Sequence, residues 1–222
     1  MKILICGDSF CVDDPRFPGL HWTEKMLNLS EDIEIANLAY GGCSNALIVL
    51  QLMQGLQLNP DFVIISFTSH NRYEYDKDIN ACPDELTDQA LAHYIKQRYT
   101  TNKYQDNATA NSLTDKWMLT AASDNFEKLK NYFYIDYCLS TLESKGIGFC
   151  YSLGGFEYQQ DYTQLINSNF LPNKLANYIK CELPINLWYY DSKDKNGPYF
   201  HVSKEDVQTL FANECYRRAL EN

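Results

Sequence analysis

Polar residues stand near the ends of several apolar segments, and their types are those that nucleophilic chemistry uses. Ser9 follows the apolar run 2–6, Asn37 lies in a second run, and Asn71 comes shortly after a third. His201 precedes the last predicted helix. A serine hydroxyl becomes an effective nucleophile when a neighbouring base, most often histidine, takes its proton. The sequence therefore holds both members of such a pair, together with two amide side chains, in separate segments.

The segments that must position these residues alternate between strands and helices. Unbroken apolar runs are typical of strands in a parallel sheet that is covered on both faces, and helical spacing of apolar residues indicates the helices between them. We expect strands over 2–6, 33–38, 62–67, 147–153 and 187–190. We expect helices over 21–29, 45–56, 84–99, 124–144, 172–181 and 204–220, and a loop over 100–111. Ser44 and Ser203 are predicted helix N-caps, and Gly146 is a predicted C-cap.

This order of elements predicts one α/β domain. Two β–α–β units at the start indicate a right-handed, parallel, doubly wound sheet. We expect a three-layer α/β/α domain of the flavodoxin-like kind over residues 1–222, with one insertion over roughly 73–123. Ligands bind such open sheets beyond the carboxyl ends of the strands. The polar residues that follow the strands should therefore converge on one edge.

Charge and composition exclude several classes of function. The 222 residues include 19 Lys and Arg against 29 Asp and Glu, a net charge of −10. Such an acidic surface repels phosphate backbones and anionic lipids, so we expect neither a nucleic-acid partner nor a membrane partner. No apolar run approaches the roughly 20 residues of a membrane-spanning helix. The eight cysteines form no C-x-x-C pair, which favours reduced thiols over a zinc site. The short apolar start does not have the length of a signal peptide, and we expect a cytoplasmic protein.

The residues after the strands resemble the sequence blocks of the SGNH (GDSL-like) hydrolase family. The first block of that family, Gly-Asp-Ser after the first strand, is matched by Gly7-Asp8-Ser9. Its second block, an Asn followed five residues later by a Gly, is matched by Asn37 and Gly42. Of its third block, Gly-x-Asn-Asp, the segment Ser69-His70-Asn71-Arg72 keeps the Asn, and of its last block, Asp-x-x-His, this chain keeps His201. The blocks follow one another in the family's order.

The resemblance implies a serine ester hydrolase that forms an acyl-enzyme and uses no metal or cofactor. Ser9 would be the nucleophile and His201 the general base. The backbone N–H groups of Ser9 and Gly42 and the side-chain amide of Asn71 would bind the oxyanion of the tetrahedral intermediate. A shift of one residue in the third strand would place His70 there instead of Asn71.

The chain departs from the family at the acidic member of the triad. Pro198 stands three residues before His201, where the family has Asp. Asp191 and Asp194 lie upstream in the same loop, and a turn at 196–198 would let either carboxylate fold back to the imidazole. We favour Asp194 because the shorter loop costs less ordering entropy. The alternative is a Ser–His dyad without a carboxylate.

Family analogy favours a small-acyl ester as substrate, such as an O-acetyl group on a carbohydrate. Two other functions remain open. An acyltransferase would use the same acyl-enzyme but exclude water and admit an alcohol acceptor. A binding module without turnover would keep the pocket, and the missing Asp together with the altered third block favours this second alternative.

Overall fold

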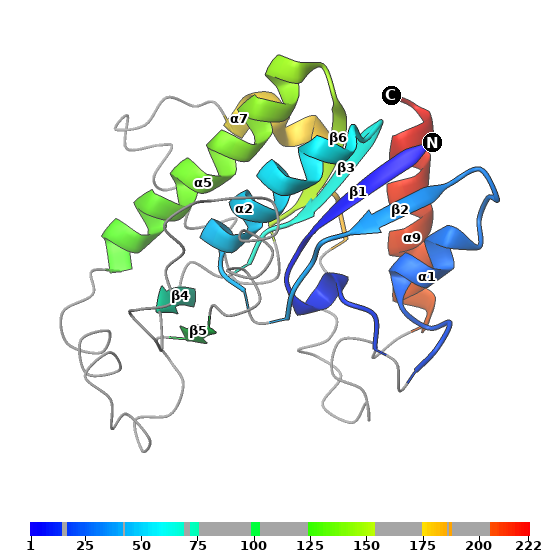
Figure 1. Ribbon diagram of the computed structural model, residues 1–222, viewed down its shortest axis with the longest axis horizontal. Helices are drawn as coiled ribbons and strands as arrows, with labels where there is room; N and C mark the ends of the chain where they lie inside the picture. Colours follow the sequence, from blue (N-terminus) through cyan, green and yellow to red (C-terminus); the bar gives the residue numbers. More distant parts are fainter. Residues whose placement is uncertain are drawn as a thin grey trace.

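A computed structural model describes residues 1–14, 17–41, 43–68, 72–75, 99–102, 124–153, 175–185, 187 and 205–222. Its centre is a four-stranded parallel sheet in the order β2-β1-β3-β6 (Figure 1). The strands are β1 (Lys2–Gly7), β2 (Glu34–Asn37), β3 (Phe62–Ser66) and β6 (Gly148–Ser152). Strand order and direction confirm the predicted doubly wound arrangement.

Helices cover both faces of this sheet, which gives the predicted three layers. The helices α2 (Asn45–Gly55) and α5 (Asp124–Lys145) pack on one face, and α1 (Trp22–Leu27) and α9 (Glu205–Leu220) pack on the other (Figure 1). Short helical segments complete the description: η1 (Ser9–Cys11), η2 (Leu56–Leu58), α7 (Leu175–Tyr178) and η4 (Ile179–Cys181). Among the described helices, none combines the length and the apolar character needed to span a bilayer.

Strand β1 shows why its sequence is apolar without interruption. Side chains alternate between the two faces of a strand, so Leu4 and Cys6 enter the core beneath α2 and α5, whereas Ile3 and Ile5 enter the core beneath α1 and α9. All four side chains are fully buried. A strand with a helical layer on each side has no face for polar residues.

Local signals in the sequence set the helix ends. The Ser44 hydroxyl accepts a hydrogen bond from the Ala46 N–H at 3.1 Å and caps α2 as predicted. Helix α5 stops at Gly146, whose φ of +65° lies in the left-handed region that favours glycine. The Gly146 N–H donates to the Glu143 carbonyl at 3.0 Å, so this predicted C-cap is also confirmed.

Four predictions at the periphery need correction or lie outside the described residues. The predicted loop 100–111 begins in a strand, because β5 (Tyr99–Asn102) pairs antiparallel with β4 (Arg72–Tyr75). The predicted strand 187–190 is described only at Leu187, which has helical backbone, and the chain instead bridges to the edge strand β6 at Glu182. The predicted helix 84–99 lies outside the described residues except for Tyr99, which belongs to β5, and the Ser203 cap lies outside them as well. The single domain and its insertion stay predictions.

Candidate active site

Ser9 begins the tight turn η1 at the carboxyl end of β1. Asp8 caps this turn: its Oδ1 accepts a hydrogen bond from the Phe10 N–H, and its carbonyl accepts one from the Cys11 N–H, both at 3.0 Å. The Ser9 carbonyl accepts a hydrogen bond from the Val12 N–H at 3.4 Å. Ser9 is half-buried, and within the described residues no group makes a hydrogen bond to its hydroxyl. The serine therefore stands on a turn that is held by hydrogen bonds of the residues on both sides of it.

The peptide of Gly7, directly before this turn, is held from two directions. Its N–H donates to Gln51 Oε1 at 2.7 Å, and its carbonyl accepts from Gln51 Nε2 at 3.1 Å. The same carbonyl accepts from the Tyr40 N–H at 3.1 Å and from the Cys43 thiol at 3.2 Å. The last residue of β1 is thus fixed by α2 and by the segment that follows β2.

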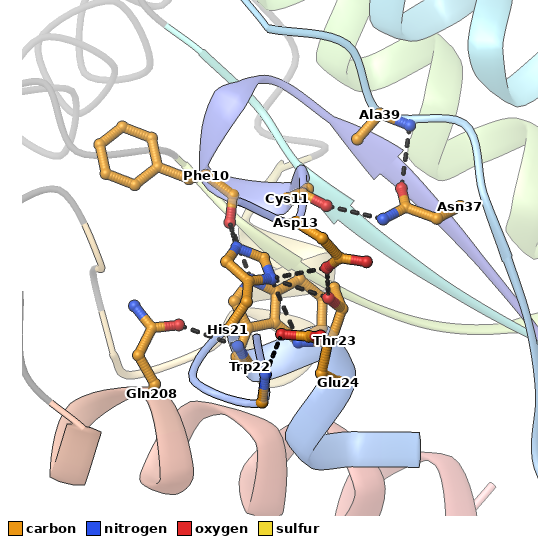
Figure 2. Close-up of polar contacts among 11 residues, drawn as sticks. Phe10, Cys11, Asp13, His21, Trp22, Thr23, Glu24, Asn37, Ala39 and Gln208 are labelled. Carbon is orange, nitrogen blue, oxygen red and sulfur yellow. Dashed lines mark hydrogen bonds and ion pairs between the residues drawn. The ribbon is translucent and has the colours of Figure 1, made fainter. Parts of the chain in front are cut away.

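The second sequence block lies against the turn that carries Ser9. Asn37 Nδ2 donates to the Cys11 carbonyl at 2.7 Å, and Asn37 Oδ1 accepts from the Ala39 N–H at 3.0 Å (Figure 2). A Cβ placed on Gly41 would lie 3.8 Å from the Ser9 Cβ. The structure therefore brings Asn37 and Gly41 to the serine turn. Gly42 is outside the described residues, and its role in an oxyanion hole stays a prediction.

A chain of buried polar side chains leads from Asp8 to the end of β3. The Thr68 hydroxyl donates to Asp8 Oδ2 at 2.8 Å. The Thr68 N–H donates to Asn45 Oδ1 at 2.7 Å, while Asn45 Nδ2 donates to the Thr68 carbonyl at 2.8 Å and to Asn131 Oδ1 at 2.7 Å. All four side chains are nearly or fully buried. They fix the point from which the third block, 69–71, departs, although His70 and Asn71 themselves are outside the described residues.

Sequence reasoning did not identify the residues that hold this site together. Asn45 and Gln51 fall within the predicted helix 45–56, yet both side chains are fully buried and bind backbone groups of β1 and of Thr68, two residues after β3. One sequence signal could have identified them: both polar residues fall on the apolar face of that helix, beside Leu47, Ile48 and Leu52. A buried amide without a partner is costly, so such positions indicate a specific bond.

The base and the predicted carboxylates fall in a part of the chain that the structure does not describe. His201, Asp194 and Asp191 all lie between the described residues 187 and 205. The next described element, α9, begins at Glu205, at the end of the sheet where β1 ends (Figure 1). The roles of these three residues stay predictions.

Cys11 is the nearest alternative nucleophile, and its surroundings disfavour it. Its side chain is fully buried, and the buried position raises the pKa of the thiol well above its ordinary value, with the Asp8 carboxylate adding to the effect. A thiol attacks as its thiolate, so a raised pKa makes it inert. The cysteines in the described part of the chain are free thiols.

Comparisons with known proteins identify the fold. The chain is similar to the psychrotrophic esterase EstA from Pseudoalteromonas sp., with a TM-score of 0.52 and 14% identity over 100% of this chain and 99% of the other. It is similar to the acetyl xylan esterase AlAXEase, with a TM-score of 0.51 and 14% identity over 98% of each chain. A member of the lipolytic protein G-D-S-L family from Veillonella parvula DSM 2008 aligns over 99% of this chain and 96% of the other, with 11% identity and a TM-score of 0.49.

The similarities to EstA and to AlAXEase establish the fold of this chain, because both proteins share it. No family model matches the sequence, and no curated protein sequence matches it. The four-stranded parallel sheet with flanking helices is a three-layer α/β/α arrangement, and the two esterases share this fold.

Proposed function

We propose that the chain is a serine-dependent ester hydrolase of the SGNH type, with Ser9 as nucleophile. The observation that supports this most is the position of Ser9 on a capped turn at the carboxyl end of β1, with the backbone at Gly41 lying against it. Ligands of open α/β sheets bind at this end. The fold shared with two esterases supports the same proposal.

In the proposed reaction, Ser9 Oγ attacks the carbonyl carbon of the ester while His201 takes the hydroxyl proton. The N–H groups of Ser9 and Gly42 and the Asn71 amide bind the oxyanion that forms. Collapse of the intermediate breaks the bond to the alcohol, which leaves with the proton from His201. Water then attacks the acyl-serine with His201 as base, and the acid is released. The reaction requires no metal ion or cofactor.

Labelling of the active serine tests this proposal. A fluorophosphonate reacts with activated serines. The structure of EstA is that of the esterase inhibited by monoethylphosphonate. We expect the label on the peptide that contains Ser9, and we expect Ser9→Ala to abolish both labelling and hydrolysis of p-nitrophenyl acetate. The melting temperature should change little, because Ser9 is only half-buried. Cys11→Ala should keep the label. Unchanged turnover in Ser9→Ala would contradict the proposal.

A second set of variants tests what orients the base. We propose Asp194 for this role, with Asp191 as the alternative. Neutralising a true third member of the triad to Asn should lower kcat on the order of 10⁴-fold, because the carboxylate fixes the tautomer and stabilises the imidazolium. If Asp191→Asn and Asp194→Asn both stay within a few fold while His201→Ala is inactive, a Ser9–His201 dyad performs the reaction. An active His201→Ala variant would make His70 the next candidate for the base.

We propose a small-acyl ester, such as an O-acetylated carbohydrate, as the substrate class. The similarity to an acetyl xylan esterase supports this choice. Acetate release from acetylated xylan, compared with release from longer p-nitrophenyl esters, measures the preference. Product analysis with and without an alcohol acceptor separates hydrolysis from acyl transfer. Binding of the ester without turnover would indicate a binding module. The cytoplasmic location stays a prediction from the sequence.

A further inference from the structure

A buried histidine lies directly behind the turn that carries Ser9. His21 is fully buried at the N-cap of α1. Its Nε2 lies 3.0 Å from the carbonyl oxygen of Phe10, the residue after Ser9 (Figure 2). The indole Nε1 of Trp22 donates to the same oxygen at 2.8 Å. Two side chains at the start of α1 therefore converge on one carbonyl of the serine turn.

The partners of the imidazole define which nitrogen carries hydrogen. A carbonyl oxygen only accepts hydrogen bonds, so His21 Nε2 must be the donor to Phe10. On the other side of the ring, Nδ1 lies 2.7 Å from Thr23 Oγ1 and 3.1 Å from Asp13 Oδ1. The Thr23 hydroxyl also donates to the Asp13 carboxylate. The hydrogen bond from His21 lowers the pKa of Asp13, as expected for a carboxylate that accepts it.

These contacts leave the serine turn little freedom. The Asp8 cap fixes the N–H of Phe10, His21 and Trp22 fix its carbonyl, and Asn37 fixes the carbonyl of the next residue. Buried peptide groups keep their hydrogen bonds because losing one is costly. Rotation of the peptide between Phe10 and Cys11 would break the two bonds to the Phe10 carbonyl and the bond from the Cys11 N–H to the Asp8 carbonyl, which closes the turn around Ser9.

Trp22 also joins the serine turn to α9. The Trp22 N–H donates to Gln208 Oε1 at 3.0 Å, and the Trp22 ring meets the Phe211 ring edge-on, with centroids 4.9 Å apart. Lys25 of α1 pairs with Glu205, the first residue of α9, at 3.0 Å. Glu205 stands four residues after His201 in the sequence. The start of α1 thus contacts both the turn of the nucleophile and the helix that follows the proposed base.

We propose that His21 is a positioning residue, which fixes the orientation of Ser9 by donating its Nε2–H to the Phe10 carbonyl. This inference rests on the proposed function of Ser9. It assigns to His21 a role in the rate of the chemical step, in addition to its contribution to the core.

Two substitutions at position 21 separate the two sides of the ring. In His21→Gln, the side-chain amide nitrogen occupies the position of Nε2 and can still donate to Phe10. In His21→Asn, the amide nitrogen occupies the position of Nδ1, so the bond to Phe10 is lost while the contacts with Asp13 and Thr23 can remain. We expect His21→Gln to stay within about threefold of the parent in kcat, and His21→Asn to lose about 10- to 100-fold with little change in KM. The rate of fluorophosphonate labelling at Ser9 should follow kcat.

A matched control removes a hydrogen bond elsewhere in the core. Tyr178→Phe deletes the bond from the Tyr178 hydroxyl to Glu143 Oε2, 2.7 Å long, which joins α7 to α5. It should lower the melting temperature and leave the labelling rate of Ser9 unchanged. Equal kcat in folded His21→Gln and His21→Asn would overturn the proposal, and so would a loss of labelling in Tyr178→Phe similar to that in His21→Asn.

A measurement on the parent protein keeps the proposal testable if the variants fail to fold. Nitrogen-15 spectra of histidine-labelled protein distinguish an imidazole that carries hydrogen on Nε2 from the neutral Nδ1–H form. We expect hydrogen on Nε2 of His21, and the neutral Nδ1–H form would overturn the proposal. Failure of the proposed function gives a different result: the parent itself would not be labelled at Ser9, whatever residue stands at position 21.

Discussion

Replacement of Gly7 by alanine should disturb the turn of the nucleophile through one identifiable contact. A Cβ on Gly7 would lie 2.6 Å from Cys11 Sγ, 3.2 Å from Cys11 Cβ and 3.1 Å from Ser66 Cβ. The φ of Gly7 is not in the left-handed region, so an alanine there has no backbone strain. The cost of the substitution in the folded state therefore comes from packing.

The magnitude follows from two opposing effects. An alanine at a compatible position stabilises a protein by about 0.4–1 kcal/mol, because it restricts the unfolded chain. Insertion of a methyl group into a filled core costs about 1–3 kcal/mol. We therefore expect Gly7→Ala to lower the free energy of unfolding by about 1–2 kcal/mol. In a Cys11→Ala background the sulfur contact is gone, and the cost should fall by about 1 kcal/mol.

Urea unfolding of the parent, the two single variants and the double variant measures this coupling. Because Cys11 is the last residue of the turn that Ser9 begins, Gly7→Ala should also slow labelling of Ser9, and Cys11→Ala should partly restore the rate in the double variant. An equal cost of Gly7→Ala in both backgrounds would refute the packing argument. Lost stability with unchanged labelling would show that the turn moves without moving Ser9.

Three further outcomes test the core and the surface. Asn45→Ala should lower the free energy of unfolding by about 2–4 kcal/mol in urea, because it leaves buried backbone groups without partners. Gly55→Ala should destabilise by about 1–3 kcal/mol, although alanine favours helices, because its Cβ would overlap the buried Leu4 side chain. The hydrogen bond from Arg217 lowers the pKa of Glu214 from 4.5 to about 2. The stability that this depressed pKa contributes is present above pH 4.5 and is lost as the pH falls towards about 2, so Glu214→Gln should weaken the acid dependence of the urea midpoint.

The central fold was predictable because its signals are local. The apolar run of β1, the cap at Ser44 and the stop at Gly146 each act within a few residues, and each is confirmed. Strand β5 was not predictable in the same way. Its Thr- and Asn-rich sequence has no apolar alternation, and its strand conformation accompanies pairing with β4.

The candidate site was only partly predictable for a similar reason. The Gly-Asp-Ser block and Asn37 stand at strand ends, where position alone indicates a site, and the structure brings them together. Gln51 binds the backbone of Gly7, which lies 44 residues away in sequence. A sequence pattern can show that a polar residue falls on an apolar helix face, but it does not indicate which peptide group that residue will meet.

The buried amides of α2 have a consequence for transplanting this site into another protein. Two side chains that bond only to each other can be exchanged together for an apolar pair of similar volume. Backbone groups cannot be removed by substitution, and Asn45 and Gln51 bind the backbones of Thr68 and Gly7. A recipient scaffold would therefore need these two amides on a helix in the same register, in addition to the serine turn itself.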